Sequence, residues 1–134
     1  AVDKRLTPIF LKEGERLRKE NRLKNFEFLY EALAAKRGLD IMAMDLEEAV
    51  SISDTFILVT GNSDIHMGTL RDAVVEALHN RGLEARVEGN DSSQWRLIDA
   101  GELIIHIFSK AGRDHYKLEK IWGDAPTYHY AYHD

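Results

Sequence analysis

The turn at residues 61–64 has residue types and a spacing that could bind phosphate. Its letters GNSD follow an apolar run and open a helical pattern, and the free amides at a helix N-terminus can hold a phosphate group. The turn lacks the Gly-Lys-Ser/Thr of a phosphate-binding loop, and Asp64 would repel an anion. We therefore interpret Ser63 as a helix cap. A nucleotide-binding or nucleotidyl-transferring enzyme is the alternative.

A nucleotidyl-transfer site would also need neighbouring carboxylates that hold magnesium against the phosphates. Glu84 and Glu88 share one face of the strand expected after this helix. At ~3.3 Å per residue they lie ~13 Å apart, which is too far for them to hold one metal ion unaided. The sequence therefore gives no strong candidate for a pair of catalytic acids.

The other residues that could do chemistry do not predict a site. His106 lies inside the apolar run LIIHIF, where a hydrogen-bonded histidine of the core or the sheet face is favoured over a general base. His129 and His133 have the spacing of metal ligands on a helix, but a terminal segment is typically frayed. Cysteine is absent, which excludes disulfides and thiolate nucleophiles. We expect no catalytic residue, no metal and no cofactor.

The segment SSQWRLIDAGE carries aromatic and acidic residues that core packing alone does not require. Alternation along a strand places Trp95, Leu97 and Asp99 on one face. A docking surface could use both end residues, with Trp95 as an anchor and Asp99 as a match for a basic partner. Alternatively, Trp95 covers the core and Asp99 begins the turn before Gly101. The sequence leaves both interpretations open.

The segment HYKLEKIWGDAP has two large aromatic residues, Tyr116 and Trp122, where leucines would complete ordinary helix packing. Both lie beside acidic residues, Glu119 and Asp124. We expect the two aromatic side chains to close the core and to border a docking surface.

The elements that carry these residues can be predicted from apolar patterns. A stripe with three-four spacing predicts a helix that ends at Gly38, and Ser63 begins a second helix that ends near Gly82. The strands that flank the second helix are expected to be parallel, and the last three strands to form hairpins. The fold class is therefore α/β or α+β, with a mixed sheet of about five strands flanked by helices. The expected strands are LDIMAMDL, TFILVTG, EARVEG, QWRLIDA and ELIIHIF.

Length and composition fit one globular domain. The chain has 134 residues, of which 44% are hydrophobic and 31% charged. It contains no run of ~18 apolar residues, so we expect a soluble, cytoplasmic protein that does not enter a membrane.

Charge is unevenly distributed along the chain. Residues 1–25 hold eight Lys/Arg against four Asp/Glu, whereas the whole chain has a net charge of −5. The acidic body favours a basic partner. The basic arm could contact RNA, or it could be a solvated helix or a mobile extension.

Three segments resemble the Iojap family of bacterial ribosomal silencing factors (RsfS, also called YbeB). They are SDTFILVTGNS followed by a helix, VEGNDSSQWRLIDAGELIIHIF, and YKLEKIWGDAP at the end of the domain. The resemblance implies a fold similar to that of nucleotidyltransferases but without their catalytic acids. It covers about residues 27–126, and the predicted organisation is a basic extension at 1–25, a family domain at 26–126 and an aromatic tail at 127–134.

The resemblance also implies a function. Members of the family bind the fourteenth protein of the large ribosomal subunit at the face where the subunits join, and they lower translation when nutrients are scarce. An inhibitor that acts by steric exclusion needs no catalytic group, so we expect a protein that is not an enzyme. Some of the implied partner-binding residues can instead stabilise the fold or a homodimer. These residues are Trp95, Leu97, Asp99, Tyr116, Leu118, Glu119, Trp122 and Asp124.

Overall fold

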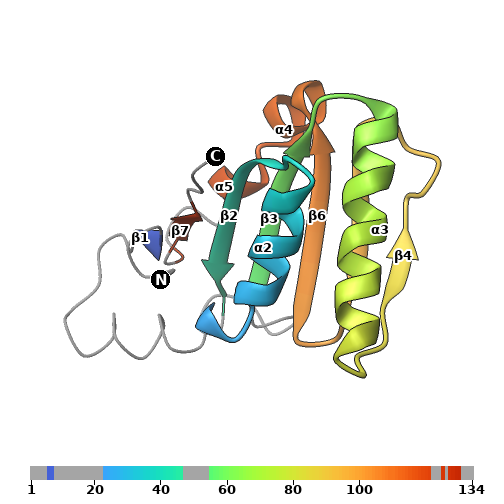
Figure 1. Cartoon of the computed structure of the whole chain (residues 1–134). Helices are drawn as coiled ribbons and strands as arrows, with labels where there is room; N and C mark the ends of the chain where they lie inside the picture. The colour runs from blue at the N-terminus through green and yellow to red at the C-terminus, as the bar shows by residue number, and fades with distance from the viewer. Residues whose placement is uncertain (1–5, 8–22, 47–54, 122–124, 126, 131–134) are drawn as a thin grey trace.

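The computed structural model describes residues 6–7, 23–46, 55–121, 125 and 127–130. They form a seven-stranded mixed sheet with helices on both faces (Figure 1). The helices are α2 (Glu27–Ala35), α3 (Asp64–Asn80), α4 (Lys110–Tyr116) and α5 (Leu118–Ile121). The strands are β1 (Leu6–Thr7), β2 (Leu39–Asp45), β3 (Thr55–Gly61), β4 (Arg86–Glu88), β5 (Trp95–Asp99), β6 (Leu103–Ser109) and β7 (Thr127–Tyr130). The predicted fold class is confirmed, and the sheet has two strands more than the sequence predicts.

The sheet has the strand order β1-β7-β2-β3-β6-β5-β4. β3 and β6 pair in parallel, and every other pairing among the described strands is antiparallel. The strands before and after α3 therefore run in the same direction, as predicted, but β6 and β5 lie between them. The crossover through α3 thus carries the chain from the centre of the sheet to its edge at β4.

α3 forms where the sequence provides a cap, an apolar stripe and a stop signal. The Oγ atom of Ser63 accepts a hydrogen bond from the amide of His66 at 3.0 Å. The chain leaves the helix through Gly82, whose φ of +71° favours glycine. α3 has 17 residues, and no helix in the described part of the chain is long and apolar enough to cross a membrane. The buried residues of α3 are Met67, Leu70, Val74 and Leu78.

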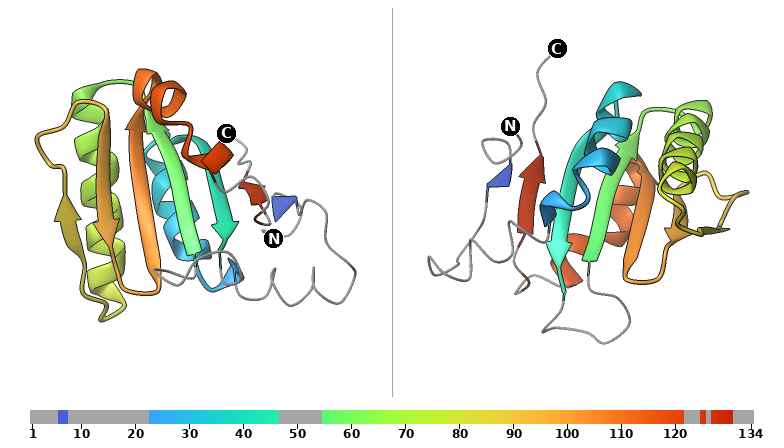
Figure 2. Two further views of the ribbon diagram at one scale, coloured as in Figure 1. Left: turned by 180° about the vertical axis from the view of Figure 1, so that it is seen from behind. Right: turned by 60° about the horizontal axis from the view of Figure 1, so that its bottom comes forward.

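The sheet separates two apolar clusters. The larger cluster lies between the sheet and the helices α2 and α3, which cover the same face (Figure 1). The second cluster lies on the opposite face, which is turned toward the viewer in the left view of Figure 2 and has α4 and α5 beside it. All seven residues of β3 are buried, because both faces of this strand meet a cluster. The second cluster consists of Met42, Met44, Leu46, Phe56, Leu58, Ile104, Phe108, Leu118 and Ala125.

The C-terminal strand β7 is part of the sheet. It pairs with β2 and places Tyr128 and Tyr130 in the larger cluster, where the ring of Tyr130 lies 5.3 Å from that of Tyr30. The expectation of a frayed segment is therefore wrong for Thr127–Tyr130. Tyr128 and Tyr130 are buried whereas His129 is exposed, which is the pattern of a strand with one face in the core.

The N-terminal arm is described at a few positions. Leu6 and Thr7 pair with β7 as strand β1, and Leu23 is fully buried in the larger cluster. The rest of the predicted helical or mobile extension, at 1–5 and 8–22, lies outside the described residues, as does His133.

Candidate functional site

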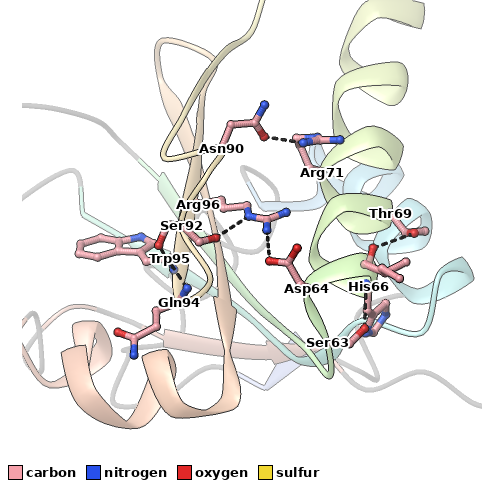
Figure 3. A network of polar contacts seen from close by, with 11 residues as sticks. Ser63, Asp64, His66, Thr69, Arg71, Asn90, Ser92, Gln94, Trp95 and Arg96 are labelled. Atoms are coloured by element: carbon pink, nitrogen blue, oxygen red, sulfur yellow. Dashed lines mark hydrogen bonds and ion pairs between the residues drawn. The ribbon is translucent and has the colours of Figure 1, made fainter.

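Successive residues of β5 point to opposite sides of the sheet, so this strand presents two different surfaces (Figure 3). Arg96 and Ile98 are buried on the side of α3. Trp95, Leu97 and Asp99 lie on the other side and are partly exposed, and the first two pack against the second cluster. The predicted alternation is confirmed. We name these three partly exposed residues the β5 strip.

Three rings from two elements contact the indole of Trp95. Phe108, which lies directly across the ladder on β6, stacks on it with ring centroids 5.3 Å apart. His106, on the same strand, has its ring 5.8 Å away. Tyr116 of α4 lies at 4.7 Å with an interplanar angle of 51°, and 38% of its surface is exposed. Trp95 and Tyr116 therefore form one aromatic surface that joins a strand to a helix.

His106 is 4% exposed and forms a hydrogen bond with this aromatic surface. Its Nδ1 accepts a hydrogen bond from the Nε1–H of Trp95 at 3.1 Å. Since an indole N–H only donates, the neutral imidazole carries its proton on Nε2. Burial lowers the pKa of His106 to about 3, because desolvation disfavours the imidazolium. The prediction of a hydrogen-bonded histidine in the sheet is confirmed.

Asp99 has contacts within the chain at the turn that follows β5. Its Oδ1 accepts a hydrogen bond from the amide of Gly101 at 2.9 Å, and its Oδ2 lies 3.3 Å from Nη2 of Arg86 on β4. The Asp99 side chain is 29% exposed and that of Arg86 is 75% exposed, so this ion pair is weak. Asp99 therefore shapes the turn and still presents a carboxylate at the surface.

The predicted residues of the closing segment differ in their positions. Leu118 is 6% exposed and packs in the second cluster, so it supports the surface from within. Glu119 accepts a hydrogen bond at Oε2 from Nε of Arg113 at 2.9 Å, so its carboxylate is engaged inside the chain. The last two predicted residues lie outside the described part of the chain: Trp122 and Asp124.

Arg113 of α4 is a residue that the sequence analysis missed. Besides Glu119, its guanidinium donates to Oγ1 of Thr60 at 3.0 Å and to the carbonyl oxygen of Asp40 at 3.2 Å. It therefore ties α4, the helix that carries Tyr116, to β2, β3 and α5. Arg113 and Glu119 are six residues apart, which is not the spacing of neighbours on one helix, so periodicity gave no signal of this pair.

In the turn between β3 and α3, the candidate phosphate site, backbone amides already donate hydrogen bonds to side chains of the same segment. The Nδ1 of His66 accepts a hydrogen bond from the amide of Asn62 at 2.9 Å, and its Nε2–H donates to the carbonyl oxygen of Lys36 at 2.7 Å. The amide of His66 is in turn bonded to Ser63. These contacts support the interpretation of Ser63 as a helix cap. Within the described ranges, no group of three or more His, Asp or Glu is placed to hold a metal ion.

A buried arginine joins this turn to the start of β5 (Figure 3). Arg96 is 4% exposed and forms an ion pair through Nη2 with Asp64 of α3. Its Nε donates to the carbonyl oxygen of Ser92 at 2.8 Å, and the Oγ of Ser92 accepts from the amide of Trp95 at 3.1 Å. The loop before β5 is therefore attached to α3, which fixes the position at which Trp95 enters the sheet.

Comparison with known proteins identifies the family. The family model described as "Ribosomal silencing factor during starvation" (RsfS) matches residues 19–133. The chain belongs to this family. The ribosomal silencing factor RsfS of Bacillus subtilis is 37% identical over 92 residues, which are 68% of this chain and 78% of that protein. A mouse protein named "Mitochondrial assembly of ribosomal large subunit protein 1" is 24% identical over 102 residues, which are 73% of this chain and 45% of the mouse protein.

A solved RsfS-like structure has the same fold. The crystal structure of a Chromobacterium violaceum protein has a TM-score of 0.72 and 31% identity, and the match covers 75% of this chain and 85% of that one. The resemblance that three sequence segments suggested is thus confirmed. RsfS proteins form a regulatory family, and the names of the relatives connect it with the ribosome.

Proposed function

We propose that this protein binds the large ribosomal subunit, through its fourteenth protein, and prevents the small subunit from joining, which represses translation when nutrients are scarce. The family name supports a role at the ribosome, and the mouse relative is named for assembly of the large subunit. One structural observation carries the proposal: the β5 strip and Tyr116 are partly exposed on the side of the second cluster, which is the sheet face opposite α2 and α3. We name these four residues the docking surface.

The side chains of the docking surface are suited to tight contact. Tryptophan and tyrosine bring a large contact area with few rotatable bonds. Both rings are already packed in the free protein, since Trp95 contacts Phe108 and Tyr116. Binding would therefore order few additional side chains, which lowers its entropic cost.

Charge favours a basic partner for this surface. The chain has a net charge of −5, and the docking surface ends at the partly exposed carboxylate of Asp99. Many ribosomal proteins are basic because they contact RNA phosphates, and opposite charge speeds association and selects the partner. A protein that occupies the joining face excludes the small subunit by its volume alone, so the proposed mechanism requires no catalytic group.

Sedimentation with purified subunits tests the proposal. The protein is mixed with isolated large subunits, and small subunits are added before or after it. We expect co-sedimentation with large subunits, and fewer joined ribosomes when the protein is added first. Protein that stays in the supernatant at physiological salt, or joining that is insensitive to the order of addition, would contradict the proposal.

Two matched variants locate the binding surface. Tyr116→Ala and Leu83→Ala each remove a large, exposed apolar side chain, with 38% and 45% of the residue surface exposed. Leu83 lies between α3 and β4, outside the docking surface. We expect Tyr116→Ala to weaken large-subunit binding about ten-fold, the size of a moderate interface contact, and Leu83→Ala to have no effect. Equal affinities in the sedimentation assay would place the interface elsewhere.

A further inference from the structure

His106 is a polar residue at a position where an apolar side chain would pack without polar cost. Its neighbours along β6 are isoleucines, Ile105 and Ile107, and its ring lies 4.5 Å from that of Phe56. Its Nε2 is buried and has no hydrogen-bond partner in the described part of the chain. A buried donor without a partner costs free energy. To offset this cost, the histidine must make a favourable interaction that a leucine at the same position could not make.

That interaction is the hydrogen bond from Trp95, in which Nε1–H donates to Nδ1 of His106 at 3.1 Å. A partly exposed indole can rotate about two side-chain bonds, and stacking on Phe108 by itself would allow the ring to turn over. A hydrogen bond at one edge of the ring selects a single orientation. It therefore determines which edge of the indole points inward to β6.

We propose that His106 is a positioning residue, which fixes the indole of Trp95 in the orientation that the partner recognises. The inference rests on the proposed function and adds to it a residue that the partner does not touch. His106 acts by remaining neutral: because burial lowers its pKa to about 3, Nδ1 keeps its lone pair at neutral pH. A residue that only filled the core would need no acceptor at this atom.

Substitutions can separate the acceptor from the volume of the ring. His106→Asn keeps an acceptor close to the position of Nδ1, whereas His106→Gln moves it one bond farther and His106→Leu removes it. Ile105→Val is the matched control, because Ile105 lies next to His106 on the same strand but packs in the larger cluster. This substitution weakens the packing of the core and leaves the hydrogen bond from Trp95 to His106 in place.

Two measurements are made on the full chain. Nitrogen-15 NMR follows the signal of the indole N–H of Trp95, which is assigned by its loss in Trp95→Phe. The same method shows which ring nitrogen of His106 carries the proton. Co-sedimentation with large subunits gives the affinity.

We expect the indole signal to shift in the Leu and Gln variants, with about a ten-fold loss of affinity, the equivalent of one net hydrogen bond. His106→Asn and Ile105→Val should stay within about three-fold of the wild type. In a Trp95→Phe background, the Leu substitution should have no further effect.

Several results would overturn the inference. An indole signal that is the same in wild type and His106→Leu would show that the hydrogen bond is absent. Unchanged affinity despite a shifted signal would show that the orientation is not used in binding. Equal losses in the Asn and Leu variants would assign His106 to packing. If the wild-type protein itself does not sediment with large subunits, the proposed function fails, while the NMR comparison still decides whether His106 orients Trp95.

Discussion

At the scale of single residues, His106 couples stability to pH. Burial lowers its pKa from 6.5 to about 3 in the folded protein. Above pH 6.5 neither the folded nor the unfolded state holds the proton. Between these two values the unfolded chain binds a proton that the folded chain excludes, so the free energy of unfolding falls as pH falls. The contribution of His106 to the free energy of unfolding is therefore fully present above the pKa that the histidine has in the unfolded state, and it is lost as the pH falls.

We expect the wild type to lose roughly 2 kcal/mol more of its unfolding free energy than His106→Leu between about pH 7 and about pH 5. The carboxylates titrate in both proteins, so the difference between them isolates the histidine. Urea unfolding at several pH values measures both curves. Parallel curves would show that the imidazole becomes protonated in the folded state.

At the scale of elements, the backbone of α4 at Gly112 lies directly against the backbone of Gln94, the residue before β5. A Cβ atom on Gly112 would overlap the carbonyl oxygen of Gln94 and lie 2.9 Å from its carbonyl carbon. The amide of Ser109 donates to the same oxygen at 3.0 Å. Gly112 therefore allows the close approach by which Tyr116 reaches Trp95.

The same substitution at two helical glycines should have opposite effects. Gly112→Ala should cost about 2 kcal/mol, since overpacking against backbone outweighs the better helix propensity of alanine. Gly68→Ala in α3 should add about 0.5–1 kcal/mol, because the nearest atoms to its Cβ are arginine nitrogens at 3.7 and 3.8 Å. Chemical denaturation measures both variants. A stabilising Gly112→Ala would show that α4 can move away freely.

The strand β7 is expected to be essential for the fold. Tyr128 is fully buried whereas its neighbour His129 is exposed. Tyr128→Ala should therefore lower the unfolding free energy by about 3–5 kcal/mol, a large part of the stability of a small domain. His129→Ala should change it by less than about 0.5 kcal/mol. Thermal unfolding measures the stability of both variants. If Tyr128→Ala destabilises the protein as little as His129→Ala, β7 contributes little to the core.

At the scale of the whole molecule, we expect charge to influence association with the proposed partner. With a net charge of −5, the protein should bind a basic surface more weakly as salt screens the attraction. We expect roughly five-fold weaker binding to large subunits between about 0.05 M and about 0.3 M salt, chiefly through slower association. Asp99→Asn should show a smaller dependence on salt. Sedimentation across a salt series measures this, and an affinity independent of salt would assign binding to apolar contacts alone.

The sequence by itself determined the features that local patterns encode. The cap at Ser63 and the alternation that places Trp95, Leu97 and Asp99 together were both predicted. Each depends on residues a few positions apart, whose geometry is fixed by the backbone of one helix or strand. The family resemblance, carried by three such segments, also came from the sequence.

Only the tertiary structure decided which distant residues meet. β7 joins the edge of β2, β6 and β5 separate β3 from β4, and Arg113 connects α4 with β2 and β3. Trp95 and His106 are eleven residues apart on neighbouring strands, and their hydrogen bond follows from the register of β5 with β6. Strand pairing depends on which strands together bury one face of the sheet. The local periodicity of a strand shows that one of its faces is buried but does not indicate which strand lies beside it. The sequence therefore predicted the residues that make up the proposed docking surface, and the fold determined what holds them in place.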